Sequence, residues 1–315
     1  MDRSIDFYKG RNYEEWLEEE GLQENFFLIT NSRRIVFIFR KGEREPRAIK
    51  KYGKRAEIEN EFINHQKAYH LFPTKIPSIY FFRLEGEMGD LCMEYVSQSH
   101  LSDIVASVWT GKKKRFLREM RETFLFLMEI LKSLPIQEGK VEDSYSYQIA
   151  KWAMDNDIQK VNQRKETRRV EEIMKEVSGI RLPLCMQHRD FCLQNILYSG
   201  RQGKMIIDWE DSKERELPVV DFNMLLVSMI EAYQELFRRE KDEFFDESNI
   251  TEVVGEIREE IRQYLGVEKG IFEKISILAT FSLWSQNLKK ERFKIAEEIF
   301  SFLNKELSRI EQFFL

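Results

Sequence analysis

The spacing of apolar residues changes character near residue 97. Before that point, short apolar runs alternate with polar turns, as strands do, and two stretches have helical spacing. The expected elements of this part are a helix over 5–20, strands over 26–30, 35–40 and 47–52, a helix over 55–72, and strands over 78–84 and 91–96. Beyond it the period is helical over 113–134, 145–178, 219–237 and 271–315. The pattern predicts an α+β chain, with a small antiparallel-sheet domain over 1–96 and a mostly helical domain over 97–315.

Composition narrows the classes of protein that fit. The 315 residues are 42% hydrophobic and 33% charged, with a net charge of -5 and no long basic run, so we expect no nucleic-acid partner. The three cysteines lack paired spacing, and the first residues lack the apolar core of a signal peptide. No apolar run approaches the roughly 18 residues of a transmembrane helix. A cytoplasmic protein without a transmembrane segment is therefore expected.

The segment 187–210 carries the clearest chemical signal. His188, Arg189 and Asp190 are followed by Asn195, and two short apolar runs separated by a Gly-containing turn lead to Asp208. Phosphoryl transfer from ATP needs one carboxylate that accepts a proton, and amide and carboxylate oxygens that hold Mg²⁺. If 195–198 and 204–207 pair as a hairpin, Asp208 returns close to Asn195. We interpret Asp190 as the catalytic base and Asn195 with Asp208 as Mg²⁺ ligands. The alternative is a surface loop whose Asp and Asn cap turns.

Lys50 is the candidate lysine for the ATP phosphates. Strand alternation over 47–52 places Ala48 and Lys50 on one face and Ile49 and Lys51 on the other. A small residue beside adenine and a lysine that reaches the phosphates should share a face, which favours Lys50. Alone, these would be two exposed lysines at a strand end; their occurrence with the other predicted groups favours the functional interpretation.

A carboxylate should anchor that lysine, and a turn should cover the phosphates. Glu61 lies between apolar positions of the helix that follows Lys50, so it is expected to face the sheet, with Glu57 as the fallback. The turn over 31–34 contains no glycine, and Ser32 or an arginine is expected to compensate there. These residues complete the predicted phosphate site.

Adenine is expected at the end of the last strand before residue 97. Met93 would form an apolar wall, and the backbone of the next three residues would bind the edge of the base. Those three residues are Glu94, Tyr95 and Val96.

With these residues the chain resembles the aminoglycoside phosphotransferase and choline kinase-like family, relatives of the protein kinases. The matching pieces extend from about residue 26 to 226 and are Ala48-Ile49-Lys50, Glu61, Met93-Glu94-Tyr95-Val96, His188 to Asn195, Ile207-Asp208-Trp209-Glu210, and 217–222 with Pro218 and Asp221.

The resemblance implies a two-lobe protein kinase-like fold and transfer of the γ-phosphate of ATP, with Mg²⁺, to a hydroxyl group. It assigns the base to Asp190 and the phosphate contacts to Lys50 with Glu61. It also implies that His188 supports the loop by hydrogen bonds and that Asp221 is an N-cap or a loop tie.

Departures from protein kinases favour a small-molecule acceptor. Family members often have Gly where this chain has Arg189. Cys192 stands where protein kinases carry a lysine two residues after the base, and Glu210 replaces the Gly of D-F-G. No A-P-E motif follows. A small-molecule hydroxyl acceptor, such as an aminoglycoside, choline or a sugar, is therefore expected.

Two other functions stay open. The first is a kinase of a cell-envelope saccharide or a lipopolysaccharide-type acceptor, because the H-R-D-F run also resembles kinases of the lipopolysaccharide core. The aromatic-rich residues 293–314 would suit a membrane surface, although packing against the helical domain is favoured. A non-catalytic pseudokinase that only binds is the second alternative. It predicts loss of at least one of Lys50, Asp190, Asn195 and Asp208, and all four are present.

Overall fold

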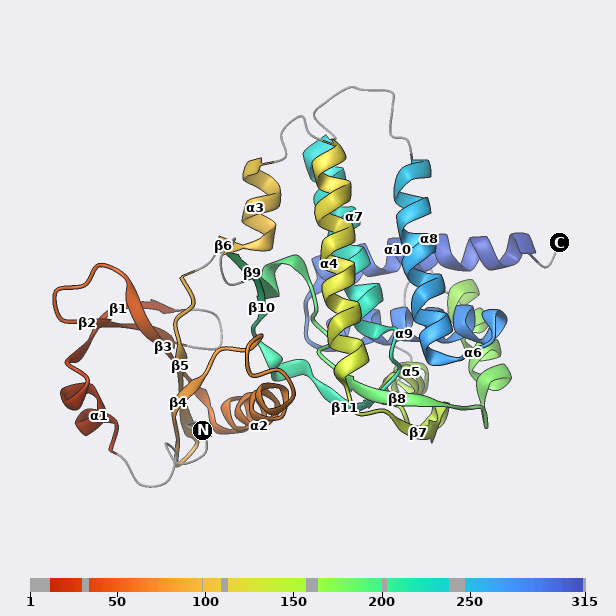
Figure 1. Cartoon of the computed structure of the whole chain (residues 1–315). Helices are drawn as coiled ribbons and strands as arrows, with labels where there is room; N and C mark the ends of the chain where they lie inside the picture. Colours follow the sequence, from red (N-terminus) through yellow and green to blue (C-terminus); the bar gives the residue numbers. More distant parts are fainter. Residues whose placement is uncertain are drawn as a thin grey trace. The chain divides into compact units, whose positions relative to one another are not determined.

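A computed structural model of the chain describes residues 12–29, 34–97, 99–108, 113–156, 164–199, 203–237 and 247–313. The chain divides into two compact units, whose elements Figure 1 labels in chain order. The first unit comprises Met1–Leu101 and Gln194–Asp211, and the second comprises Ser102–Leu193 and Ser212–Leu315. Each unit has its own sheets and its own buried side chains.

The first unit is built on an antiparallel sheet with the strand order β1-β2-β3-β5-β4. Its elements are α1 (Tyr13–Glu19), β1 (Leu22–Ile29), β2 (Arg34–Arg40), β3 (Pro46–Lys54), α2 (Arg55–Leu71), β4 (Ile79–Glu85), β5 (Met88–Glu94) and β6 (Ser99–His100), and later in the chain β9 (Ile196–Ser199), β10 (Gly203–Ile206) and η4 (Trp209–Asp211). The predicted meander of the first three strands is confirmed by their antiparallel registers. Helix α2 follows β3 directly and ends just before Pro73, which cannot continue a helix.

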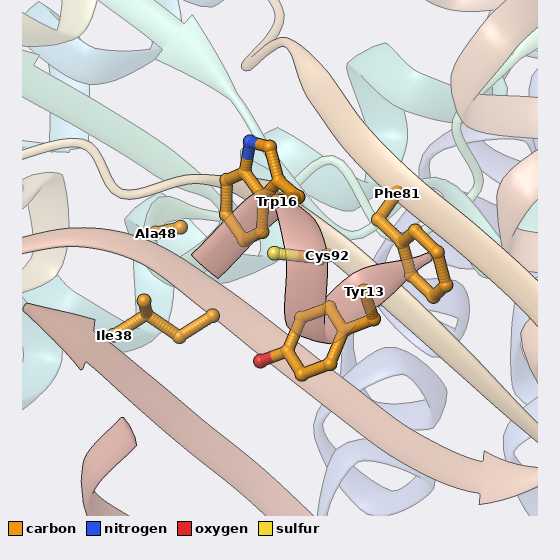
Figure 2. Close-up of a cluster of buried hydrophobic side chains, with 6 residues drawn as sticks. All are labelled: Tyr13, Trp16, Ile38, Ala48, Phe81 and Cys92. Carbon is orange, nitrogen blue, oxygen red and sulfur yellow. The ribbon is translucent and has the colours of Figure 1, made fainter. Parts of the chain in front are cut away.

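The two faces of this sheet pack against different helices. Figure 2 shows one face, where the buried side chains of Ile38, Ala48, Phe81 and Cys92 gather with Tyr13 and Trp16 of α1. On the other face, Leu91 and Met93 pack with Ile58 of α2. Because successive side chains of a strand point to opposite faces, β3 directs Ala48 toward α1 and Ile49 toward α2.

A hairpin from late in the chain completes the first unit. Strands β9 and β10 pair antiparallel, with Ile206 opposite Ile196, and β6 pairs with β9 to form the sheet β10-β9-β6. Gly203 begins β10 with a φ of 77°, a left-handed conformation that suits glycine. The predicted hairpin between Asn195 and Asp208 is thereby confirmed.

The second unit is mostly helical. Its elements are α3 (Leu101–Val108), α4 (Lys113–Ser133), β7 (Gln137–Lys140), η2 (Val141–Asp143), α5 (Tyr145–Asp155), α6 (Arg164–Val177), β8 (Arg181–Gln187), η3 (Leu193–Asn195, which ends in the first unit), β11 (Lys213–Glu216), α7 (Val220–Phe237), α8 (Glu247–Leu265), α9 (Lys269–Lys289) and α10 (Phe293–Phe313). The sheet order is β11-β8-β7. Helix α9 is buried on all sides over 275–287, which explains its weak amphipathicity.

Two predicted helices of this unit are interrupted. The stretch 145–178 contains α5 and α6, and 271–315 divides into α9 and α10 at Lys290–Arg292. Ile299, Phe302 and Leu303 of α10 are buried, which confirms the packing interpretation for those residues. Within the part of the chain that the structure describes, no helix is both long enough and apolar enough to cross a membrane.

Candidate functional site

Lys51 is the centre of an ion-pair cluster in the first unit. Its Nζ lies 2.5 Å from Glu61 Oε1 on α2 and 2.9 Å from Asp208 Oδ1, which follows β10. The Glu61 side chain is fully buried, whereas the Asp208 side chain is 31% exposed. Burial alone would lower the pKa of Lys51, but the charges of Asp208 and Glu61 outweigh it and raise that pKa above its ordinary value. The cluster therefore holds an ammonium group and a partly exposed carboxylate.

The predicted pairing of Lys50 with Glu61 is wrong. Lys50 shares the α1 face with Ala48, where it forms an ion pair with Glu24, and its Nζ lies 4.1 Å from the centre of the Tyr13 ring. The predicted alternation along β3 is correct. The error lies in the choice of face, because α2 covers the face that carries Lys51.

Helix α2 also holds the segment that carries Asp208. The side-chain amides of Asn60 and Asn64 donate to the Glu210 carbonyl at 2.5 and 3.4 Å. Asp208 itself has a φ of 66°, a left-handed conformation that costs most residues about 1–2 kcal/mol but that Asp tolerates better. One turn beyond Asn60 and Glu61, buried His65 donates from Nε2 to the Pro77 carbonyl at 2.6 Å, and burial lowers the pKa of His65 to about 4.

Oxygen ligands suitable for a divalent cation gather at the same place. The carboxylates of Glu61, Asp208 and Glu210 offer oxygens that all lie within 4.8 Å of one another. The Asn195 carbonyl accepts a hydrogen bond from the Ile207 N–H at 3.1 Å, which ties the Asn195 position to the residue before Asp208. Carboxylate and amide oxygens are the ligands that Mg²⁺ prefers, so this donor set fits that ion.

The residues predicted to hold adenine do not all lie on the same face of the sheet. Ala48, Glu94, Tyr95 and Val96 line a pocket of about 690 Å³, whereas Met93 lies on the α2 face. Other walls of the pocket are Trp16, Leu22, Arg40, Tyr80 and Met205. The N–H groups of Glu94 and Tyr95 donate to the Ser78 and Arg47 carbonyls, at 2.8 and 3.0 Å, within the unit. Ser32 lies outside the described residues.

In the second unit, the loop that carries Asp190 is fixed by its backbone. The N–H groups of His188 and Arg189 donate to the carboxylate of Asp221 on α7, at 2.8 and 2.7 Å. Burial raises the pKa of Asp221, and these bonds and the nearby His188 and Arg189 oppose the rise only in part. His188 is buried, and its Nδ1 accepts from the Asp190 N–H at 3.2 Å. Asp221 is thus the expected loop tie, and His188 supports the loop as expected.

Arg189 forms a buried polar network behind this loop. Its guanidinium pairs with Glu216, both side chains being fully buried, and its Nε donates to Gln286 of α9 at 2.7 Å. The same group lies 4.6 Å from the centre of the Tyr145 ring. Its backbone φ of 68° is unusual for a residue other than glycine, and such conformations persist where the surroundings enforce them.

The Asp190 side chain itself faces a second arginine. Arg292, which precedes α10, places Nη1 3.6 Å from Asp190 Oδ2, and the two side chains are 31% and 19% exposed. The predicted base is therefore accessible, within its own unit, beside a cation.

The sequence did not indicate three of these contacts. The alternation along 47–52 favours Lys50 over Lys51, and only the packing of α2 shows which of the two faces Glu61. The partners of Arg189 and Arg292 could not be predicted from the sequence pattern, because those partners lie far away along the chain.

Known proteins resemble this chain in family and in fold. The family model described as "Phosphotransferase enzyme family" matches residues 18–253. The crystal structure of choline kinase LicA from Streptococcus pneumoniae is similar, with a TM-score of 0.54 and 12% identity over 94% of this chain and 97% of that chain. A structure of LicA in complex with AMP gives a TM-score of 0.53 and 12% identity over 93% and 96%. No curated protein matches significantly. The predicted α+β, kinase-like fold is confirmed.

Proposed function

Because this chain belongs to the phosphotransferase enzyme family and is an ATP-dependent small-molecule kinase, we propose that it transfers the γ-phosphate of ATP to a hydroxyl group. One observation carries the proposal. Lys51 is paired at once with a buried carboxylate, Glu61, and with a partly exposed one, Asp208. Kinases need a lysine held by a helix carboxylate next to a metal-binding aspartate.

Lys51, in place of Lys50, is proposed to contact the ATP phosphates. Glu61 keeps the ammonium group in position, and the raised pKa of Lys51 keeps it charged. Asp208 with Asn195, and Glu210 beside them, would hold Mg²⁺. The ion supplies positive charge to the phosphate oxygens when bound.

Asp190 is proposed as the base. The acceptor oxygen attacks the γ-phosphorus while its proton passes to an Asp190 carboxylate oxygen. The bond between the γ-phosphorus and the β,γ-bridging oxygen breaks, and ADP leaves with the electron pair. Four residues separate Asp190 from Asn195 in the sequence, so the segment with the base leads directly into the segment with the metal ligand.

The base of the nucleotide is proposed to bind at the end of β5. The pocket lined by Glu94, Tyr95 and Val96 supports this position, and its volume of about 690 Å³ lies in the range of small-molecule sites. The N–H groups of Glu94 and Tyr95 already donate within the unit, so the proposal assigns the contacts to the Glu94 carbonyl and the Val96 N–H.

The acceptor is proposed to be a small molecule with a hydroxyl group. Choline is the first compound to test, because the similar solved structures are of a choline kinase. The three cysteines are free and buried, which supports a proposed location in a reducing compartment such as the cytoplasm.

The test is ADP release from ATP and Mg²⁺ over a panel of acceptors: choline, ethanolamine, aminoglycosides, hexoses, heptoses and envelope saccharides. Asp190→Asn serves as the blank, and its turnover should fall by about 10²–10⁴-fold because the base acts in the transition state. Equal turnover of the blank would remove Asp190 from the mechanism. No release with any acceptor, and no stabilisation by Mg²⁺ and ATP, would favour the non-catalytic binding module.

A further inference from the structure

The C-terminal turn of α9 contacts two consecutive residues of the loop that carries the base. Gln286 accepts from Arg189 Nε at 2.7 Å, and Arg292 Nη1 lies 3.6 Å from Asp190 Oδ2. These contacts all lie within the second unit. The C-terminal end of α9 and the residues just after it therefore contact both the buried Arg189 and the partly exposed Asp190.

The backbone of this turn is fixed by hydrogen bonds. The Glu291 N–H donates to the Leu288 carbonyl at 3.0 Å, and the Arg292 N–H donates to the Asn287 carbonyl at 2.9 Å. This pattern, with the φ of 57° at Glu291, is a Schellman motif, in which glycine usually takes the left-handed position. A glutamate there shows that the turn keeps its shape without glycine, and strain of this kind is common at functional positions.

A simpler explanation is that Arg292 only balances the helix dipole. Cations are favoured near helix C-termini, and Lys289 and Lys290 precede it on the same turn. Lys289, however, lies over the Trp152 ring at 4.4 Å, whereas Arg292 reaches the carboxylate of Asp190. A partly exposed ion pair contributes little to stability, so a stabilising role alone does not account for this contact.

The loop itself supplies no other cation suited to this role. Arg189 is buried and paired with Glu216, and Cys192, two residues after Asp190, is a buried thiol. A general base must be ionised and correctly oriented, and an opposite charge within about 4–6 Å favours the ionised form. Arg292 meets this requirement from a distant element.

We propose that Arg292 is a positioning residue for phosphoryl transfer, which keeps the Asp190 carboxylate ionised and oriented toward the acceptor hydroxyl. The inference rests on the proposed function, because it assumes that Asp190 is the base. Other titratable and charged groups near this loop in the described part of the second unit include His188, Cys192, Arg189 with Glu216, Asp221, and Lys213 of β11, which is paired with Gln187, as well as Lys289, Lys290 and Glu291 of the turn that carries Arg292.

Site-specific labelling of Asp190 tests this inference without an acceptor. Carbodiimide with glycine ethyl ester modifies protonated carboxyl groups of the folded full-length protein over a pH series. Trypsin then releases the peptide 190–201, in which Asp190 is the sole acidic side chain, for mass spectrometry. Removal of the guanidinium by Arg292→Gln should raise the pH of half-maximal labelling by about one unit. Arg292→Lys should restore most of the difference.

Lys290→Gln is the matched control, since it removes one positive charge from the same turn. It should leave the half-maximal pH of Asp190 labelling unchanged. A purely structural role for Arg292 would change the extent of labelling, through exposure, but not its midpoint. An unchanged midpoint in Arg292→Gln, or an equal shift in Lys290→Gln, would overturn the inference. Arg292→Ala provides a second neutral variant if the first unfolds.

ADP release separates this inference from the proposed function. With an acceptor that the panel identifies, Arg292→Gln should lower kcat about tenfold and shift its acidic limb upward in parallel with labelling, with little change in KM for ATP. An inactive Asp190→Asn beside an unaltered Arg292→Gln would refute only the role of Arg292. Full activity of Asp190→Asn would refute the proposed function itself.

Discussion

Lys51 in the first unit and Arg189 in the second both bind carboxylates, but they differ in exposure. The Arg189–Glu216 pair is fully buried on both sides, and Gln286 and the Tyr145 ring are among its other contacts. Lys51 pairs with one buried carboxylate, that of Glu61, and with one that is 31% exposed, that of Asp208. An ion pair that is closed off from solvent on both sides leaves no room for a ligand, whereas a pair with an accessible member can exchange that member for a ligand. This difference in exposure distinguishes the structural Arg189–Glu216 pair from the proposed phosphate site at Lys51.

Arg189→Met should have the largest effect on stability. It leaves the Glu216 carboxylate buried without its cation, which costs about 3–5 kcal/mol of unfolding free energy. Urea unfolding measures the loss, and the double variant Arg189→Met with Glu216→Met should recover much of it. A single variant as stable as the parent would break the comparison, because the buried pair would then have no structural role.

The two adjacent lysines of β3 test the other side of the comparison. Lys51→Met should lower kcat/KM for ATP by about 10²–10³-fold, as expected for loss of a charge that stabilises the transition state. Lys50→Met removes the same charge from the α1 face and should change kcat/KM for ATP by less than about threefold. Steady-state kinetics of both variants shows which of the two lysines acts on ATP. A larger loss in the Lys50 variant would restore the original prediction.

Asp208→Asn should remove the stabilisation that Mg²⁺ and ATP confer together. At ATP about 100-fold above its Kd, binding stabilises a protein by about 2.7 kcal/mol. Thermal unfolding with ATP, with and without Mg²⁺, measures the metal-dependent part. Glu85→Gln, which changes an exposed carboxylate of the same unit, is the control and should keep the full shift. A persistent shift in Asp208→Asn would exclude Asp208 as a ligand.

The smallest effect on stability is expected at Glu298, whose carboxyl group lies beside that of Glu231. Burial and a hydrogen bond with Glu231 raise the pKa of Glu298 from 4.5 to about 7. The folded chain thus binds this proton more tightly than the unfolded chain, so its stabilising effect is full below pH 4.5 and is lost as the pH rises through 7.

Glu298→Gln should remove that pH dependence. Since the Glu298 side chain is still 24% exposed, solvent screening limits the gain to about 1 kcal/mol at pH 8. Urea unfolding at pH 5 and pH 8 measures it. Equal pH dependence in variant and parent would show that the two carboxylates do not share a proton.

Local pattern was sufficient for much of the fold. The alternation in 26–52 predicted the meander, and the apolar runs around the turn before Gly203 predicted the β9–β10 hairpin. Glu61 was predicted to face the sheet because it lies between apolar turns of its helix, and it is fully buried. Such features depend on neighbours within a few residues.

Contacts between distant segments could not be predicted in the same way. The choice between Lys50 and Lys51 depends on which face of β3 is covered by α2, and alternation is identical for both choices. Arg189 and Gln286 are 97 residues apart, and no periodicity connects them. The roles of Asp190, Asn195 and Asp208 in the reaction stay predictions.

The return of the chain to the first unit has a consequence for biosynthesis. The hairpin whose strand β9 pairs with β6, and the aspartate that pairs with Lys51, belong to the segment Gln194–Asp211. Chains grow from the N-terminus at roughly 5–20 residues per second. The first unit therefore cannot acquire all its parts until more than ninety residues of the second have been synthesised. A fragment that ends at Leu101 would keep Lys51 and Glu61 but lack Asp208.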